Sequence, residues 1–210
     1  MAHPVPVAVL SAVPHPSPLT ARLATPADGA ACASIYAPYV ASTAISFELE
    51  APSAEEMAAR IERTIARTPW VVVEVHGMVR AYAYGARHRD RAAYDRTVET
   101  TVYVDGAFAG RGLGRRAMRA LLAILRLQGA HLAVAGVTPP NAASEGLHVA
   151  LGFRRVGTFE AIGYKHGAWH AVTWFALELG PRAAVPGPFV PLPELGGSQA
   201  LEEALAGSLS

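Results

Sequence analysis

The chain has 210 residues, of which 51% are hydrophobic and 17% charged, which is enough for one domain of ordinary size with a sizeable core. Its 18 basic and 17 acidic residues give a formal charge of +1, so no overall field favours nucleic acid or an acidic membrane surface, and we expect neither partner. No apolar run approaches the roughly 18 residues of a membrane span, and the lone Cys32 cannot form an internal disulfide, so we expect a cytoplasmic protein in which Cys32 is a small buried residue.

Both ends of the chain are rich in proline and are expected to be tails, the C-terminal one flexible or loosely packed on the domain. Residues 1–18 contain five prolines and neither Lys nor Arg, so they lack the positive start and the unbroken apolar segment of a signal peptide. Residues 181–210 begin with closely spaced prolines and end in a polar, Ala-rich segment. We therefore expect one folded domain over residues 19–180.

Hydrophobic periodicity and turn residues predict strands and helices between the tails. The predicted strands lie at residues 20–24, 70–75, 78–85, 97–104, 131–138, 153–162 and 168–179. The predicted helices lie at residues 26–40, 53–68, 112–128 and 141–151, with a short strand or extended loop at 42–50. This order predicts an α/β (α+β) fold with one mixed, mostly antiparallel sheet flanked by helices on both faces.

The most informative stretch is residues 97–119, in which a β-branched strand runs through a glycine-rich joint into a helix that carries arginines. Glycines at 110, 112 and 114 allow a sharp turn and bring backbone N–H groups close to a ligand, while the positive end of the new helix points at the same place. The joint therefore predicts an anion site. Arg115 follows Gly114, which excludes both the Gly-Lys-Ser/Thr ending of a triphosphate loop and the third glycine of a dinucleotide fingerprint.

A second basic stretch, residues 87–96, joins two predicted strands and contains four arginines, His88 and Tyr94. Cations gathered beside a tyrosine favour a site for a negatively charged group. The alternative is a solvated basic loop without a ligand.

Short motifs accompany the glycine joint in a fixed order along residues 20–179. They are Ile35-Tyr36, Pro69-Trp70, the Ala-Tyr repeat at 81–84, the segment 93–104, Pro140-Asn141, the Leu-His to Gly-Phe run at 147–153 and the Gly-Tyr-Lys-His-Gly turn with Trp-His at 163–170. With the x-x-Gly-x-Gly joint they resemble the GNAT superfamily of N-acetyltransferases, and within it the phosphinothricin and methionine sulfoximine acetyltransferases. The resemblance implies the GNAT fold, acetyl-CoA as co-substrate with no metal, and a small-molecule amine as acceptor.

The resemblance also implies that the joint holds the pyrophosphate of coenzyme A. Backbone N–H groups would bind the phosphates, and Arg111, Arg115 or Arg116 could add charge. The preceding strand would present backbone to the pantetheine arm, with Asn141 on the far side of that arm. The implied coenzyme-binding residues are Val102, Tyr103, Val104, Ala109, Gly110, Arg111, Gly112, Leu113, Gly114, Arg115 and Asn141.

Two residues match family positions that deprotonate the acceptor amine, Glu99 and His148. Glu99 stands in an otherwise uncharged β-branched strand, where we expect it to be buried with a partner or a catalytic role, the alternative being an exposed residue on an edge strand. His148 lies on a short predicted helix, and an unperturbed imidazole titrates near neutrality, the alternative being a satisfied core histidine. We expect Glu99 to act as base, directly or through a water, with His148 as its helper.

Five residues match positions at or near the family's acceptor site: Phe47, Arg91, Tyr94, Lys165 and His166. Arg91 or Lys165 could pair with an acceptor carboxylate. The aromatic side chains could equally serve packing alone. Relatives in this branch are commonly dimers, so the resemblance further implies a homodimer with its acceptor sites near the interface.

Three departures from the family pattern affect what the resemblance implies. Ala109 replaces a Gln or Arg at the start of the joint, where backbone N–H groups do most of the binding, so coenzyme binding should survive. Val149 replaces a Glu and Ala171 an Asp, so two carboxylates near the acceptor are missing. The acceptor could therefore be phosphinothricin, methionine sulfoximine, methionine sulfone, or another small amine such as a different amino acid or an antibiotic. A catalytically silent coenzyme A-binding protein is the alternative from another class, and the presence of Glu99 and His148 argues against it.

Overall fold

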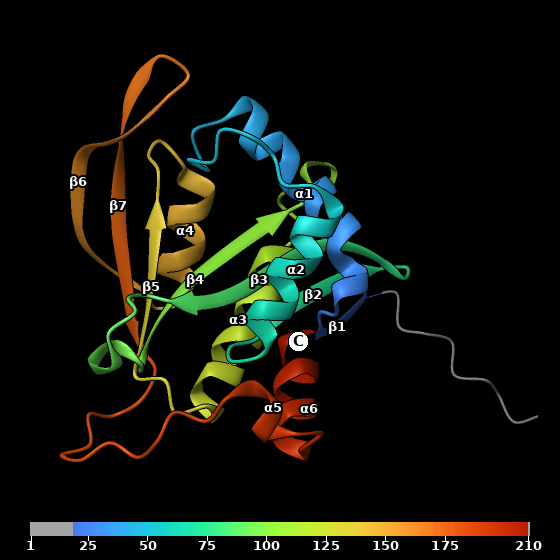
Figure 1. Cartoon of the computed structure of the whole chain (residues 1–210), viewed down its shortest axis with the longest axis vertical. Helices are drawn as coiled ribbons and strands as arrows, with labels where there is room; N and C mark the ends of the chain where they lie inside the picture. Colours follow the sequence, from blue (N-terminus) through green and yellow to red (C-terminus); the bar gives the residue numbers. More distant parts are fainter. Residues whose placement is uncertain (1–18, 210) are drawn as a thin grey trace, which may run out of the picture.

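The computed structural model describes residues 19–209, which form one seven-stranded sheet in the order β1-β2-β3-β4-β5-β7-β6 (Figure 1). The strands are β1 (Leu19–Leu23), β2 (Trp70–Val75), β3 (Met78–Arg87), β4 (Thr97–Val104), β5 (Leu132–Val137), β6 (Arg154–Lys165) and β7 (Ala168–Glu178). Neighbouring strands are antiparallel except β4 and β5, which are parallel. The predicted mixed, mostly antiparallel sheet is confirmed, and the segment at 42–50 contains no strand.

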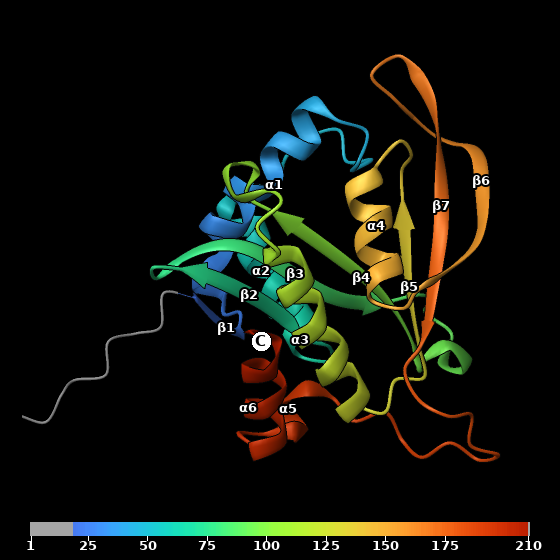
Figure 2. The same ribbon diagram turned by 180° about the vertical axis from the view of Figure 1, so that it is seen from behind.

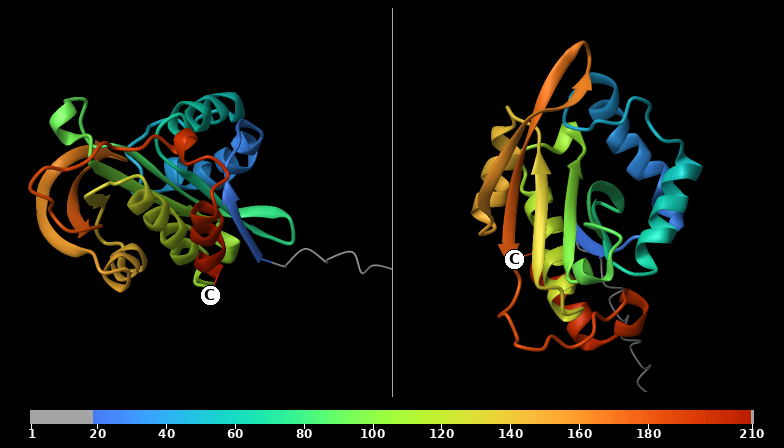
Figure 3. Two further views of the ribbon diagram at one scale, coloured as in Figure 1. Left: turned by 90° about the horizontal axis from the view of Figure 1, so that it is seen from below. Right: turned by 60° about the vertical axis from the view of Figure 1, so that its left-hand side comes forward.

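Four helices cover the two faces of this sheet. They are α1 (Gly29–Ser42), α2 (Ala54–Ile65), α3 (Leu113–Leu127) and α4 (Ala142–Ala150). Figures 2 and 3 show α1 and α2 on one face and α3 and α4 on the other. The start of α2 is fixed as the sequence predicts, because the Ser53 hydroxyl accepts the N–H of Glu56 at 3.1 Å.

Side chains that alternate along the strands divide the core in two. Ala81 and Ala83 of β3 pack with α3, whereas Tyr82 between them packs with α1 and α2. Cys32 belongs to the second core and is fully buried, as predicted. Burial raises the pKa of its thiol to about 12, so this cysteine is inert. Within residues 19–209 no helix is long and apolar enough to cross a membrane.

The expectation that residues 181–210 form a flexible or loosely packed tail is wrong for residues 192–209, because they form helices with buried side chains. Residues 192–209 form α5 (Leu192–Leu195), α6 (Gln199–Ala206) and a 3-10 turn (Gly207–Leu209). Leu192 and Leu201, each 6% exposed, pack against Ile124 of α3 and Val71 of β2. The spaced leucines form an apolar stripe, and its burial against α3 holds the segment in place. The tail predicted at residues 1–18 lies outside the described residues.

Candidate active site

The parallel pair β4–β5 is where the sheet opens. The two strands are paired only where Thr97, Val98 and Glu99 face residues 132–134. Beyond Glu99, β4 stays paired with β3 as far as Val104, while β5 pairs with β7, and the two arrows diverge in Figure 1. Strands that separate leave their facing backbone groups without ladder partners, so an extended ligand can bind them there.

A small cavity of about 110 Å³ occupies this gap. Residues 100–103 of β4 line one side of it, and residues 136–138 with Asn141, Ser144 and His148 line the other. Asn141 therefore lies across the gap from Val102 and Tyr103. Its Oδ1 also accepts the N–H of Ser144 at 3.1 Å and so caps α4, which fixes the side chain beside the gap.

The glycine joint leaves the start of α3 open. Gly110 and Gly112 adopt left-handed φ values of 75° and 77°, and a Cβ on either would meet no atom within 4 Å. Gly112 is the N-cap of α3, and no side chain caps the helix. The first N–H groups of α3 can therefore bind an anion from outside the chain. Gly114 differs, because a Cβ there would lie 3.1 Å from Cγ2 of Val104, so glycine lets α3 pack closely on β4.

The three arginines expected to assist the joint have different surroundings. Arg111 stacks over the Phe108 ring, with its guanidinium carbon 4.8 Å from the ring centroid. Arg115 is exposed on the first turn of α3. Arg116 instead donates from Nη1 to the carbonyl of Leu209, so the C-terminal segment already engages its guanidinium. Of the three, Arg111 and Arg115 remain available for phosphate.

Glu99 is the last residue of β4 that pairs with β5. Val98 belongs to the core on the α3 face, so alternation turns Glu99 to the opposite face, which carries α1 and α2. The Glu99 side chain is 38% exposed, which differs from the buried carboxylate expected, because α1 and α2 pack on β2 and β3 rather than over the β4–β5 junction. Its Oε2 lies 3.6 Å from Nδ1 of His88, a residue that follows β3 and was not among the predicted site residues.

His148 lies apart from Glu99, in the core on the α4 side. Its ring stacks on Phe175 and meets Phe153 edge-on, with centroid distances of 5.7 and 5.0 Å. Its Nδ1–H donates to the carbonyl of Ser144 at 2.8 Å, and its Nε2 is buried without a hydrogen-bond partner among the described residues. Burial lowers the pKa of His148, and the Ser144 hydrogen bond opposes that shift. The ring packing resembles the core-histidine alternative, but Nε2 has no partner among the described residues and His148 lines the cavity between β4 and β5, so the helper role stays a prediction.

The predicted acceptor residues fall into two clusters at opposite ends of β7 (Figure 1). Arg91 and Tyr94 are exposed in the β3–β4 connection, where they line a cavity of about 340 Å³ with Arg89 and Asp90. Lys165 and His166 belong to the tip of the β6–β7 hairpin, and Phe47 belongs to the α1–α2 loop beside it. Within this chain the structure does not bring the five residues together.

Lys165 forms a structural link at the hairpin tip. Its Nζ donates to the carbonyls of Val40 and Ser46 at 2.6 and 2.7 Å, and the residue is only 3% exposed. Burial lowers the pKa of Lys165, and the charge of Glu48 opposes that shift. The expectation that Lys165 could pair with an acceptor carboxylate is wrong, because its ammonium group is buried against two carbonyls of the α1–α2 region.

Phe47 packs at the same contact between loop and hairpin. Its ring covers Gly163 of β6, where a Cβ would overlap the ring atoms, and its centroid lies 6.2 Å from that of His170. His166 is exposed in the hairpin turn, with φ at 50°. Phe47 thus packs on the hairpin tip and with Lys165 links it to the α1–α2 loop, while 37% of Phe47 is exposed and its acceptor-site role stays a prediction.

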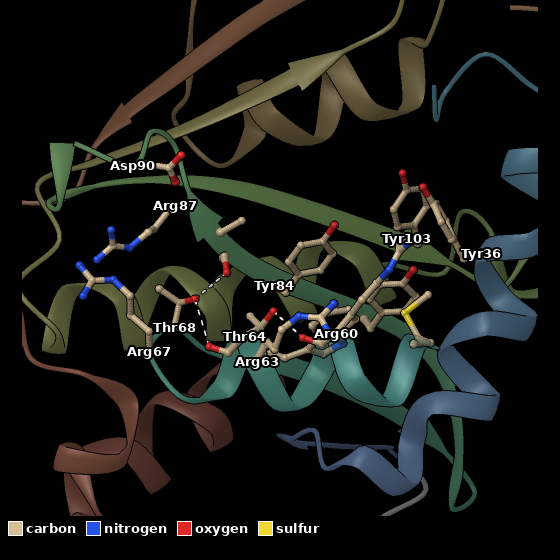
Figure 4. Close-up of a pocket in the computed structure, with 15 residues that line it drawn as sticks. Tyr36, Arg60, Arg63, Thr64, Arg67, Thr68, Tyr84, Arg87, Asp90 and Tyr103 are labelled. Carbon is tan, nitrogen blue, oxygen red and sulfur yellow. Dashed lines mark hydrogen bonds between the residues drawn. The ribbon is translucent and has the colours of Figure 1, made fainter. Parts of the chain in front are cut away.

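A larger cavity has a volume of about 630 Å³, and Figure 4 shows the residues that line it. It lies between α2 and the end of β3, and one lining residue, Ala86, pairs with Glu99 across the β3–β4 ladder. The Tyr84 hydroxyl in this cavity is close enough to feel the charge of Glu99. The cavity thus reaches the neighbourhood of the candidate base.

Four arginines line this cavity: Arg60, Arg63, Arg67 and Arg87. Arg60 forms ion pairs with Glu48 and Glu56 at 2.6 and 2.5 Å. Arg67 and Arg87 both pair with Asp95, at 3.2 and 3.3 Å. The sequence reasoning missed this cavity. The available signal was the spacing of three arginines in residues 60–67: Arg60 and Arg63 lie one turn apart on α2, and Arg67 follows just after the helix ends.

Comparison with known proteins agrees with this geometry. Residues 37–153 match the acetyltransferase (GNAT) family. The chain belongs to this family. It is 40% identical over 177 residues to the phosphinothricin N-acetyltransferase of Streptomyces viridochromogenes, an alignment that covers 82% of this chain and 97% of the relative. It is 36% identical over 167 residues to the L-methionine sulfoximine/L-methionine sulfone acetyltransferase of Salmonella typhimurium, covering 79% of this chain and 98% of that relative.

The fold of this GNAT enzyme is shared with a solved relative. The phosphinothricin acetyltransferase from Sinorhizobium meliloti in complex with acetyl-CoA matches it with a TM-score of 0.77 and 30% identity, over 85% of this chain and 97% of that one. The resemblance to this branch of the superfamily and the GNAT fold are therefore confirmed, as are N-acetyltransferase activity and acetyl-CoA as co-substrate. The open start of α3 and the gap between β4 and β5 suit the phosphates and the arm of that coenzyme.

Proposed function

We propose that this GNAT enzyme acetylates the amino group of a small amino-acid-like acceptor, with Glu99 as the general base. The observation that carries the proposal is the placement of Glu99 where β4 and β5 separate, on the strand that leads to the uncapped start of α3. Five residue steps separate Glu99 from Val104, which is about 16 Å of extended strand. One continuous segment thus provides a base at one end and a phosphate site beyond the other.

Glu99 would remove a proton from the acceptor ammonium and so free the nitrogen lone pair. Acetyl-CoA, when bound, supplies the acetyl group as a reactive thioester. The amine forms the new C–N bond as the C–S bond breaks, and its second proton ends on the coenzyme sulfur, so the products are an amide and a thiol. Because Glu99 is 38% exposed, it can return its own proton to water after each turnover.

We infer that the acceptor occupies the arginine-lined cavity beside Glu99. Its volume of about 630 Å³ is ample for an amino acid, and a guanidinium suits a carboxylate or another oxoanion. Arg63, which is exposed and lines this cavity, is a candidate for the acceptor carboxylate. Arg91 is a second candidate from the neighbouring cavity of about 340 Å³, which shares Asp90 with this one. The relatives act on phosphinothricin and on methionine sulfoximine or sulfone, and we propose the same class here, with loss of the amine charge detoxifying such a compound. Val149 and Ala171, at positions where the family pattern has carboxylates, leave another small amine as the second candidate.

The test is thiol release from acetyl-CoA with phosphinothricin, methionine sulfoximine, methionine sulfone and a panel of amino acids. We expect Glu99→Gln to keep coenzyme affinity while turnover falls at least ~10²-fold, the loss typical of a missing general base. Glu160→Gln, an exposed carboxylate on β6, is the matched control and should turn over normally. Near-normal turnover in Glu99→Gln would refute the base assignment, and release with no acceptor despite tight coenzyme binding would favour a silent coenzyme-binding protein.

We also propose that the enzyme is a homodimer through the β6–β7 face. β6 is an edge strand, and exposed apolar side chains follow the hairpin: Val156, Phe159, Ile162, Tyr164 and Trp169, with exposures between 51% and 67%. An exposed edge strand with such side chains favours contact with another chain. Sedimentation at micromolar concentration should give the dimer mass, and Phe159→Lys should give the monomer. A monomeric wild-type protein would contradict the proposal.

A further inference from the structure

One ring nitrogen of His88, Nδ1, is buried next to Glu99 without a hydrogen-bond partner among the described residues. This nitrogen is inaccessible to solvent and lies 3.6 Å from Oε2 of Glu99. A buried ring nitrogen without a partner costs free energy, so its retention calls for a reason. Catalytic hydrogen bonds are often long before substrate binds, and a small movement of either side chain would bring these atoms within bonding distance.

Aromatic neighbours fix the orientation of the His88 ring. Tyr94 from the β3–β4 connection and Trp174 from β7 both meet it at steep angles of 73° and 78°, with centroids 6.0 and 5.9 Å away. The His88 side chain is 21% exposed, so most of the ring is enclosed. Because two elements hold the ring, Nδ1 stays directed at the carboxylate and cannot easily swing into solvent.

We infer that His88 is a positioning residue that donates a hydrogen bond from Nδ1 to Oε2 of Glu99 during acetyl transfer. The inference rests on the proposed role of Glu99 as base. A glutamate that is 38% exposed on a strand can adopt several side-chain rotamers, only some of which reach the acceptor amine. A donor that holds one carboxylate oxygen fixes the rotamer and leaves the other oxygen, Oε1, to take the proton.

His88 thus has the role that the sequence suggested for His148. The Nδ1–H of His148 is engaged by the Ser144 carbonyl and its ring packs against Phe153 and Phe175. Among the described residues, the histidine that has a ring nitrogen within 4 Å of the Glu99 carboxylate is His88. His88 reaches Glu99 because the antiparallel pairing of β3 and β4 sets Ala86 opposite Glu99, and His88 follows two residues later.

Two substitutions separate a positioning role from simple packing. His88→Asn keeps an N–H donor near the place of Nδ1, whereas His88→Phe keeps the ring between Tyr94 and Trp174 but has no donor. We expect His88→Phe to lower kcat about 10- to 100-fold with an unchanged KM for acetyl-CoA, and His88→Asn to recover most of that loss. Wild-type kcat in His88→Phe, or equal losses in both variants, would overturn the inference.

A double-mutant cycle tests whether His88 acts through Glu99. In a Glu99→Gln background, His88→Phe should lower turnover less than about twofold, since the group it positions is already disabled. A full loss in that background would assign His88 a role independent of Glu99 and would overturn the inference. Normal turnover in Glu99→Gln itself would instead refute the proposed base, so the two failures are distinguishable.

A spectroscopic measurement decides the contact without any acceptor. In ¹⁵N NMR spectra of the full chain, the neutral His88 ring should carry its proton on Nδ1, and Glu99→Ala should move the proton to Nε2. A wild-type ring with unprotonated Nδ1, or a tautomer that ignores Glu99→Ala, would overturn the inference even if no acceptor were found.

Discussion

Lys165, the only lysine in the chain, offers a sharp test of structure against sequence pattern. Lys165→Met keeps much of the side-chain length but removes both hydrogen bonds to the carbonyls of Val40 and Ser46. A hydrogen bond to a charged group contributes about 1.5–3 kcal/mol, so the two bonds together contribute roughly 3–6 kcal/mol. Removing the charge also relieves the cost of burying it, so we expect a net loss of about 2–4 kcal/mol in the free energy of unfolding.

The assay for Lys165→Met combines urea unfolding, followed by tryptophan fluorescence, with the KM for the acceptor. We expect the urea concentration at the midpoint of unfolding to fall. The KM of the folded enzyme for the acceptor should change less than about threefold, since Lys165 is 3% exposed and not available to a ligand. Glu160→Gln on the same strand is the control and should change stability by less than about 0.5 kcal/mol. Unchanged stability together with a tenfold rise in acceptor KM would refute this reasoning and restore Lys165 as an acceptor residue.

Three further predictions concern the C-terminal helices, two helical glycines and His148. Leu201→Ala should lower the free energy of unfolding by about 2–4 kcal/mol, because Leu201 is buried against α3, whereas Glu202→Ala on the exposed side of α6 should change it by less than about 0.5 kcal/mol. Gly146→Ala should raise stability by about 0.5–1 kcal/mol, since a Cβ there meets no atom within 4 Å, while Gly29→Ala should lower it because a Cβ would lie 2.6 Å from a carbonyl oxygen of α2. Burial lowers the pKa of His148 below 6.5, so the unfolded chain binds a proton there that the folded protein does not, and stability should fall as the pH drops below about 6.5, by at most ~1.4 kcal/mol per pH unit.

Urea unfolding also provides the contradicting outcomes for these three predictions. Equal losses in the two α6 variants would mean that this helix does not pack on α3 in solution. Changes of the same sign in the two glycine variants would contradict the close contact of α1 with α2. For the pH dependence, His148→Phe should flatten the stability curve below about pH 6.5. His76→Asn, at an exposed turn residue with φ at 52°, should leave the curve as it is.

Much of this fold and of the candidate coenzyme site could be predicted from local sequence. β4 was predicted at residues 97–104 and lies there, because alternating β-branched residues suit a strand that packs on both faces. The open start of α3 depends on Gly110 and Gly112, whose left-handed φ values follow from the residue type within a short turn. Such features involve neighbours in the chain, so pattern and spacing suffice to predict them.

Other features depend on partners that are far apart in sequence. Lys165 is bound by carbonyls 125 and 119 positions away, and no spacing rule connects them. Leu201 belongs to a helix that is stable because α3 and β2 cover its apolar stripe, whereas the proline content of the same segment suggested a tail. The resemblance gave Lys165 a role at the acceptor and composition placed Leu201 in a tail, whereas packing buries both residues.

Glu99, the proposed base, shows which part of the site each level of structure determines. Sequence alone identified Glu99 as a carboxylate in a strand where one is unexpected, which is a statement about residue type and pattern. Which histidine lies beside it was decided by the register of β3 against β4 and by the ring contacts with Tyr94 and Trp174, so the candidate changed from His148 to His88. Side-chain partnership at this distance depends on tertiary packing, because residues on three different elements must meet within a few ångströms.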